Sequence, residues 1–167
     1  MFQRLRWLWA FLLAGAAAVI LWGLAARFPG PVTGVLSPVN ESPWEMGKLA
    51  FWPYLCAAVL LWRTEAPGEE AGRGGHCAGA LLSAAVMAAL CRLLWGIVPS
   101  YLLFFASIGS GMILYHAVRK GKWGSGMVWY LAAVLLGVAY VLLTARPLTG
   151  GLFLDPRDAA AMATIPF

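Results

Sequence analysis

The chain has 167 residues, of which 62% are hydrophobic and only 11% are charged, and its mean hydropathy is +0.78. A soluble domain carries charges on roughly a quarter of its residues, so this composition argues against a water-soluble globule and favours an all-α integral membrane protein. The formal net charge is +5. The basic residues are scattered at segment ends and form no continuous basic face, which argues against a nucleic-acid partner.

Five apolar segments predict five transmembrane helices in a single transmembrane domain covering residues 1–167. Each segment is close to the ~20 residues that a bilayer-spanning helix needs. The predicted helices cover residues 7–26, 43–62, 76–98, 101–118 and 126–144. A Pro/Gly-rich outer loop at 27–42 is expected to lack regular helix, a charged inner loop occupies 63–75, and a C-terminal tail runs from 145 to 167.

The first apolar segment has a second interpretation. Leu24-Ala25-Ala26 resembles a signal-peptide cleavage site. Because the apolar core of a signal peptide is usually shorter, about 7–15 residues, the length of this segment favours a retained helix.

The distribution of lysine and arginine predicts the orientation of the chain. With the N-terminus inside and the C-terminus outside, seven basic residues fall on the inner side and four on the outer side. The inner residues are Arg4, Arg6, Arg63, Arg73, Arg119, Lys120 and Lys122, and the outer residues are Arg27, Lys48, Arg146 and Arg157. This asymmetry follows the positive-inside rule and indicates a multi-pass membrane protein with this orientation.

Residues 37–49, Ser-Pro-Val-Asn-Glu-Ser-Pro-Trp-Glu-Met-Gly-Lys-Leu, form the most densely polar passage between two apolar segments. Ser42 suits the N-cap of the second helix, Pro43 its first position, and Glu45 the third position of a capping box. Glu41 and Glu45 would also share one helix face if the helix extended that far back, where they could bind a cation or share a proton. Pro53 is expected to kink the same helix.

Arg92 is the one charge inside the third predicted helix. It lies about 9 Å below the outer surface if that helix ends at residue 98, and a buried guanidinium in a membrane usually pairs with a carboxylate. The hypothesis is that Arg92 pairs with Glu41 or Glu45 and shapes an outward-facing polar pocket. An inert arginine whose side chain reaches the interface is the alternative.

The candidate binding site is therefore an outer polar cluster. Its members are Asn40, Glu41, Ser42, Trp44, Glu45, Lys48, Arg92 and Asp155. A catalytic residue is not assigned, because these residues include no pair of nucleophile and base.

The passage 37–49 resembles the signature of a small bacterial membrane-protein family of unknown function, whose members carry S-P-V-N-E-S-x-W-E-H-x-K-L followed by an aromatic-rich F-x-P. Phe51-Trp52-Pro53 fills the second place, and residues 152–156, Leu-Phe-Leu-Asp-Pro, are similar to the closing L-F-x-D-P segment of that family. The resemblance implies a similar layout of helices and a location in a bacterial cytoplasmic membrane, and it implies no particular activity. Met46 stands where the family pattern has histidine.

The sequence offers no pattern typical of a metal or cofactor site. Cys56, Cys77 and Cys91 form no C-x-x-C pair and are expected to be buried, unreactive thiols. His76 and His116 are predicted near the inner ends of their helices, away from the glutamates, so neither a haem nor a zinc site is expected. Residues 107–111, Ser-Ile-Gly-Ser-Gly, are interpreted as a small-residue packing seam.

Three functions are compatible with these residues. The first is a small carrier or binding protein for a small anionic or zwitterionic ligand, with the polar cluster as its pocket. The second is a non-catalytic membrane subunit or assembly factor whose protein partner docks on the outer cluster. The third is a membrane-embedded enzyme that uses Glu41 as acid or base on a lipid-like substrate.

Overall fold

The computed structural model describes residues 2–63, 72–94, 96–120, 126–146, 148 and 150–155. This part of the chain is all-α and contains no strand, as the composition predicts. The elements in order are α1 (Phe2–Arg27), α2 (Pro31–Leu36), α3 (Pro43–Arg63), α4 (Gly72–Leu94), α5 (Ser100–Lys120), α6 (Gly126–Ala145) and the short 3-10 helix η1 (Gly151–Phe153).

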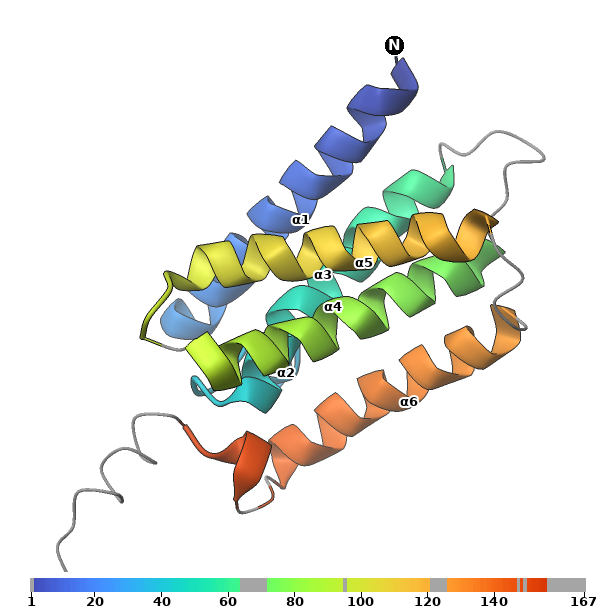
Figure 1. Cartoon of the computed structure of the whole chain (residues 1–167). Coiled ribbons are helices and arrows are strands. Elements are labelled where there is room, and N and C mark those ends of the chain that lie inside the picture. The colour runs from blue at the N-terminus through green and yellow to red at the C-terminus, as the bar shows by residue number, and fades with distance from the viewer. Residues whose placement is uncertain are drawn as a thin grey trace, which may run out of the picture.

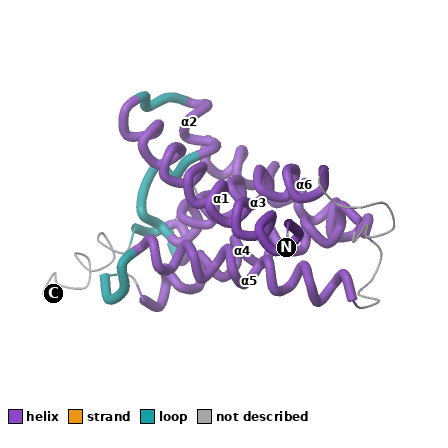
Figure 2. Tube along the Cα trace, turned by 90° about the horizontal axis from the view of Figure 1, so that it is seen from above, coloured by secondary structure: helices purple, strands orange, loops and turns teal. Residues whose placement is uncertain are grey.

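The five long helices run back and forth and form one bundle (Figure 1). Helix α4 lies in the middle and packs against α3, α5 and α6, while α1 packs chiefly against α3. Helix α2 and the described loops gather at one end of the bundle (Figure 2). This end, called the α2 end below, also holds the start of α3, the end of α4 and η1 (Figure 1).

Small side chains allow α4 and α5 to approach closely. A Cβ atom on Gly79 of α4 would lie 2.8 Å from the carbonyl oxygen of Gly111 in α5, and a Cβ on Gly111 would collide with the backbone of Gly79. Gly111 therefore belongs to a packing seam, as the sequence predicts. Gly109 does not, because a Cβ at that position would meet no atom within 4 Å.

The outer surface of the bundle is strongly apolar. Helix α6 exposes a row of large aliphatic side chains, and α1 does the same along most of its length; they include Leu12, Val19, Ile20, Leu131, Leu135, Val138 and Leu142. Such continuous apolar faces would be unfavourable in water. Among the described residues, four helices are long and apolar enough to cross a bilayer, within Trp7–Leu24, Gly74–Leu94, Ser100–Ala117 and Gly126–Ala145. The architecture thus fits a multi-pass membrane protein.

The expected loop at 27–42 is wrong in its first half. Helix α1 continues to Arg27, and residues 31–36 form the short helix α2 with Pro31 at its first turn. Proline is favourable there because the first N–H groups of a helix have no partner within the helix and the fixed φ of proline suits the helix. The hydroxyl of Thr33 also donates to the carbonyl of Gly30 at 3.0 Å.

The third predicted helix is displaced along the chain. It was expected over 76–98, whereas α4 covers Gly72–Leu94 and is followed by Gly96 with φ of 77°. A glycine in this left-handed conformation commonly ends a helix. Arg92 therefore lies in the last turn of α4, and its side chain is exposed, instead of lying several residues inside the span.

The other long helices begin and end close to the expected positions. Helix α3 continues through Pro53 to Arg63, and the expected kink stays a prediction. Cys77 and Cys91 are buried, but Cys56 is exposed, so the expectation of three buried thiols is wrong for Cys56. Most of the expected inner loop, at 64–71, and the tail from residue 156 lie outside the described residues.

Candidate functional site

The start of α3 is held by a polar network that differs from the expected capping box. The backbone N–H of Glu45 donates to the hydroxyl of Ser42 at 3.3 Å, so Ser42 is the N-cap as predicted. The reciprocal half of the box is absent, because the N–H of Ser42 donates to Oδ1 of Asn40 at 3.1 Å. The carboxylate of Glu45 instead accepts the N–H of Val39 at 3.0 Å and the ammonium of Lys48 at 2.6 Å.

Lys48 is fully buried, with 0% of its side chain exposed, and all three of its ammonium protons have an acceptor. Besides Glu45, its Nζ donates to the carbonyl of Gly34 at 3.0 Å and to the hydroxyl of Thr144. Three acceptors match the three donors of an ammonium group. Lys48 therefore ties α2, the start of α3 and the end of α6 together, and it is a structural residue more than a ligand-binding one.

The two passages that carry the family resemblance meet at the α2 end. The N–H of Glu41 donates to Oδ2 of Asp155 at 3.1 Å, across more than a hundred residues of sequence. The indole of Trp44 packs between Tyr140 of α6 and Phe153 of η1, at centroid distances of 4.8 Å and 5.2 Å. The residues around η1 are thus docked on the start of α3 by one hydrogen bond and one aromatic stack.

Arg92 does not take part in this network. Within the described residues it forms no ion pair, and Glu45 is already paired with Lys48. The expected ion pair of Arg92 with Glu41 or Glu45 is therefore wrong. The physical reason is that α4 ends at Leu94, which leaves Arg92 at the end of its helix and exposed, where it needs no carboxylate to offset desolvation.

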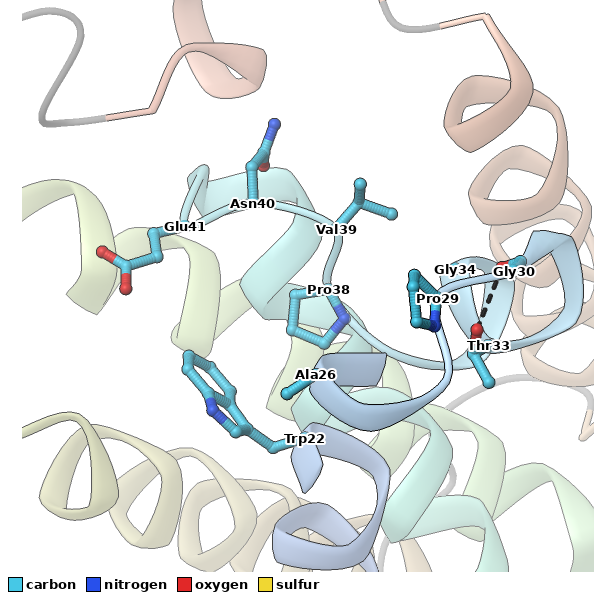
Figure 3. Close-up of a pocket in the computed structure, with 10 residues that line it drawn as sticks. All are labelled: Trp22, Ala26, Pro29, Gly30, Thr33, Gly34, Pro38, Val39, Asn40 and Glu41. Atoms are coloured by element: carbon cyan, nitrogen blue, oxygen red, sulfur yellow. Dashed lines mark hydrogen bonds between the residues drawn. The ribbon is translucent and has the colours of Figure 1, made fainter. Parts of the chain in front are cut away.

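Two cavities with partly polar linings, called the polar cavities below, open beside Glu41 at the α2 end. One of about 350 Å³ lies between the end of α1, α2 and the loop that carries Asn40 and Glu41. Figure 3 shows its lining, with the indole of Trp22 extending from α1 toward Glu41. The second, of about 440 Å³, lies between Trp22, Glu41 and the connection from α4 to α5, residues 96–100.

An apolar groove lies next to these cavities. Its volume is about 270 Å³, and it lies between α1 and α5, with α3 and α4 behind it. Trp22 lines the groove and both polar cavities, so the three spaces share one wall. Among the described residues that line them, Glu41 is the only charged side chain.

Met46 lines the apolar groove and is fully buried. The position where the similar family carries histidine therefore faces the groove and not the polar cavities. In this chain the side chain there contributes apolar surface.

Sequence reasoning identified Glu41 and Asn40 but missed Trp22 and the groove residues. Trp22 lies near the end of the first apolar segment, where a tryptophan is typical of the membrane interface and does not by itself indicate a binding site. Its proximity to Glu41 depends on how α1 crosses α3. A local pattern could not reveal that arrangement.

The two histidines lie in an aromatic cluster away from these cavities. His76 stacks on Tyr115 with ring centroids 4.2 Å apart, and Trp7 packs on His116 at 4.4 Å. The part of the chain that the structure describes contains no group of three His, Cys, Asp or Glu residues able to hold a metal ion.

No protein-family model, curated protein or solved structure matches the chain. The resemblance based on residues 37–49 and 152–156 therefore stays a prediction.

Proposed function

We propose that this protein is a multi-pass protein of a bacterial cytoplasmic membrane that binds an amphiphilic molecule at the α2 end. The headgroup would lie in the polar cavities beside Glu41, and a hydrocarbon tail would lie in the groove between α1 and α5. The observation that carries the proposal is the shared wall at Trp22, which joins polar cavities of about 350 and 440 Å³ to an apolar groove of about 270 Å³.

The chemistry of the lining selects the headgroup. Glu41 supplies negative charge and Asn40 an amide, while no lysine or arginine is among the described lining residues. Acceptors of this kind favour a headgroup that donates hydrogen bonds, such as a primary ammonium or a set of hydroxyls. This proposal departs from the anionic ligand considered from the sequence, because that ligand depended on Arg92 facing Glu41.

The test compares two cationic amphiphiles of equal tail length, dodecylamine and dodecyltrimethylammonium. Both carry one positive charge, but only the primary amine donates hydrogen bonds. We expect the purified protein to bind dodecylamine more tightly, and Glu41→Gln to lower that affinity about tenfold, or about 1.4 kcal/mol. Quenching of tryptophan fluorescence during titration measures the affinity.

The control is Glu69→Gln, which removes one negative charge from a different part of the sequence. It should leave the affinity unchanged. Glu41→Gln keeps the size of the side chain and the backbone hydrogen bond from residue 41 to Asp155, so the variant should unfold close to the temperature of the wild type. The proposed site would be contradicted if the wild type bound the two amphiphiles with equal affinity. It would also be contradicted if Glu41→Gln and Glu69→Gln lowered the affinity for dodecylamine equally.

We further propose that all five long helices cross the membrane, with the N-terminus inside and the C-terminus outside. Helix α3 is not among the four helices whose length and composition suit a membrane span, but its 21 residues rise about 31 Å, close to the ~30 Å of a bilayer core. Its polar residues Glu45 and Lys48 are buried against α2 and α6, so they need not face lipid. The seven-to-four excess of basic residues supports the orientation.

A further inference from the structure

A second groove lies on the opposite flank of α4, between α4 and α6. Its volume is about 640 Å³, the largest of the cavities described here, and its walls are almost entirely apolar. Leu81, Ala85, Ala88 and Arg92 line it from the side of α4. These positions recur at helical spacing, so they lie along one face of the helix.

The groove is open because the α4 wall is made of small side chains. Four alanines of α4 line it, and on the other side Leu136 and Tyr140 of α6 form the wall. Helices α4 and α6 pack against each other, and the groove is the part of their interface that side chains do not fill. Apart from Arg92, the described lining residues with a polar side-chain group are Trp44 and Tyr140, and the rest of the lining is aliphatic.

The only charged side chain among the described residues that line this groove is Arg92, at the α2 end. It is exposed and forms no ion pair within the described residues. Since a guanidinium presents five N–H donors in a fork that matches phosphate oxygens, a phosphate group is the complementary ligand.

The length of the groove fits one leaflet of a bilayer. From Leu81 to Arg92, α4 rises about 16 Å at 1.5 Å per residue, and half of a hydrocarbon core is about 15 Å. A polar group that contacts Arg92 at the interface would therefore carry a chain that ends near Leu81, close to the bilayer midplane.

We propose that this groove binds an anionic phospholipid of the leaflet at the α2 end, with its phosphate on Arg92 and one acyl chain between α4 and α6. The site is separate from the cavities beside Glu41, and it prefers the opposite charge. In this proposal Arg92 binds a lipid phosphate. The sequence had suggested either an ion pair with a glutamate or an arginine that only reaches the interface.

The experiment measures how much lipid stays bound to the full-length protein, purified in detergent and incubated with equimolar phosphatidylglycerol and phosphatidylcholine. Native mass spectrometry counts each lipid on the protein. We expect about fivefold more phosphatidylglycerol than phosphatidylcholine on the wild type. Arg92→Gln should abolish this preference, while Arg146→Gln, which removes an exposed cation at the same end, should keep it.

A second pair of variants tests the groove itself. Ala88→Leu fills the space between α4 and α6 and should reduce the retention of both lipids severalfold. Ala106→Leu adds the same atoms to an exposed position of α5 outside the groove, and it should retain both lipids as the wild type does. Glu41→Gln should also leave the phosphatidylglycerol preference unchanged, so failure of this site and failure of the amphiphile site can be distinguished.

Several outcomes would overturn the proposal. One is a wild type that shows no preference for phosphatidylglycerol, and another is an Arg92→Gln variant that keeps the preference. Equal lipid retention in Ala88→Leu and Ala106→Leu would show that the lipid belongs to the general lipid shell. A dimer that Ala88→Leu abolishes would show that a second copy of the chain occupies the groove instead.

Discussion

At the residue scale, Lys48 shows how a polar passage can serve the fold instead of a ligand. Its ammonium group is buried and meets a carboxylate, a backbone carbonyl and a hydroxyl from three different elements. A buried charge is tolerated only when it is paired and hydrogen-bonded. The ion pair with Glu45 at 2.6 Å therefore belongs to the support of α2 and not to the binding surface.

Lys48→Met tests this role. The variant leaves the carboxylate of Glu45 buried without its cation, so we expect the free energy of unfolding to fall by about 3–5 kcal/mol. Denaturant unfolding in detergent, followed by circular dichroism, measures the change. The double variant Glu45→Gln/Lys48→Met removes both charges and should recover most of the loss. A single variant as stable as the wild type would show that the pair contributes nothing to the fold.

At the scale of the element, the helices are held at distances set by their smallest residues. Helices α4 and α5 meet at Gly79 and Gly111, where neither position has space for a methyl group. Dispersion between closely packed backbones is the main source of helix association in a membrane, because lipid is as apolar as the side chains. The same α4 uses alanines on its other flank, where the groove toward α6 remains open.

Gly111→Ala should destabilise the bundle by about 1–3 kcal/mol, because the added Cβ would collide with the backbone of Gly79 and α4 and α5 would have to separate. The change is measured by thermal unfolding in detergent. Gly109→Ala is the matched control, since its Cβ meets nothing within 4 Å and alanine favours helix by up to about 1 kcal/mol. Equal effects of the two substitutions would rule out the seam.

At the scale of the whole molecule, the α2 end is where separate parts of the sequence converge. The starts of α3 and α5, the ends of α1, α4 and α6, and η1 all lie there (Figure 1). The hydrogen bond between Glu41 and Asp155 and the contact between the rings of Trp44 and Phe153 fasten residues 37–49 to the residues around η1. One end of the bundle thus carries nearly all of the polar contacts discussed here.

The number of spans determines on which side the C-terminus lies. Five spans with the N-terminus inside place the C-terminus outside. If α3 did not cross the membrane, four spans would place both termini on the same side. We expect alkaline phosphatase fused after Phe167 to be active and green fluorescent protein at that position to be dark, because the first reporter folds only outside and the second only inside. Green fluorescent protein fused within the loop between α3 and α4 should be bright. Fluorescence from the C-terminal fusion would exclude five spans with the N-terminus inside.

The sequence by itself determined the helical class, the positions of the five long helices to within a few residues at most ends, and the N-cap at Ser42. These features depend on the length of each apolar segment and on the capping residues at its start, and both can be recognised in the sequence. It also singled out Glu41 and Asp155, because charged residues are conspicuous in an apolar chain.

Only the tertiary structure decided which of these residues meet. Whether Glu45 pairs with Lys48 or with Arg92 depends on where α4 ends, and Gly96, with its φ of 77°, ends it four residues before the expected position. The cavities beside Glu41 depend on the path of α1 across α3, and the groove below Arg92 depends on the distance between α4 and α6. Packing between helices sets these distances, and hydrophobic periodicity along one helix does not specify its neighbours.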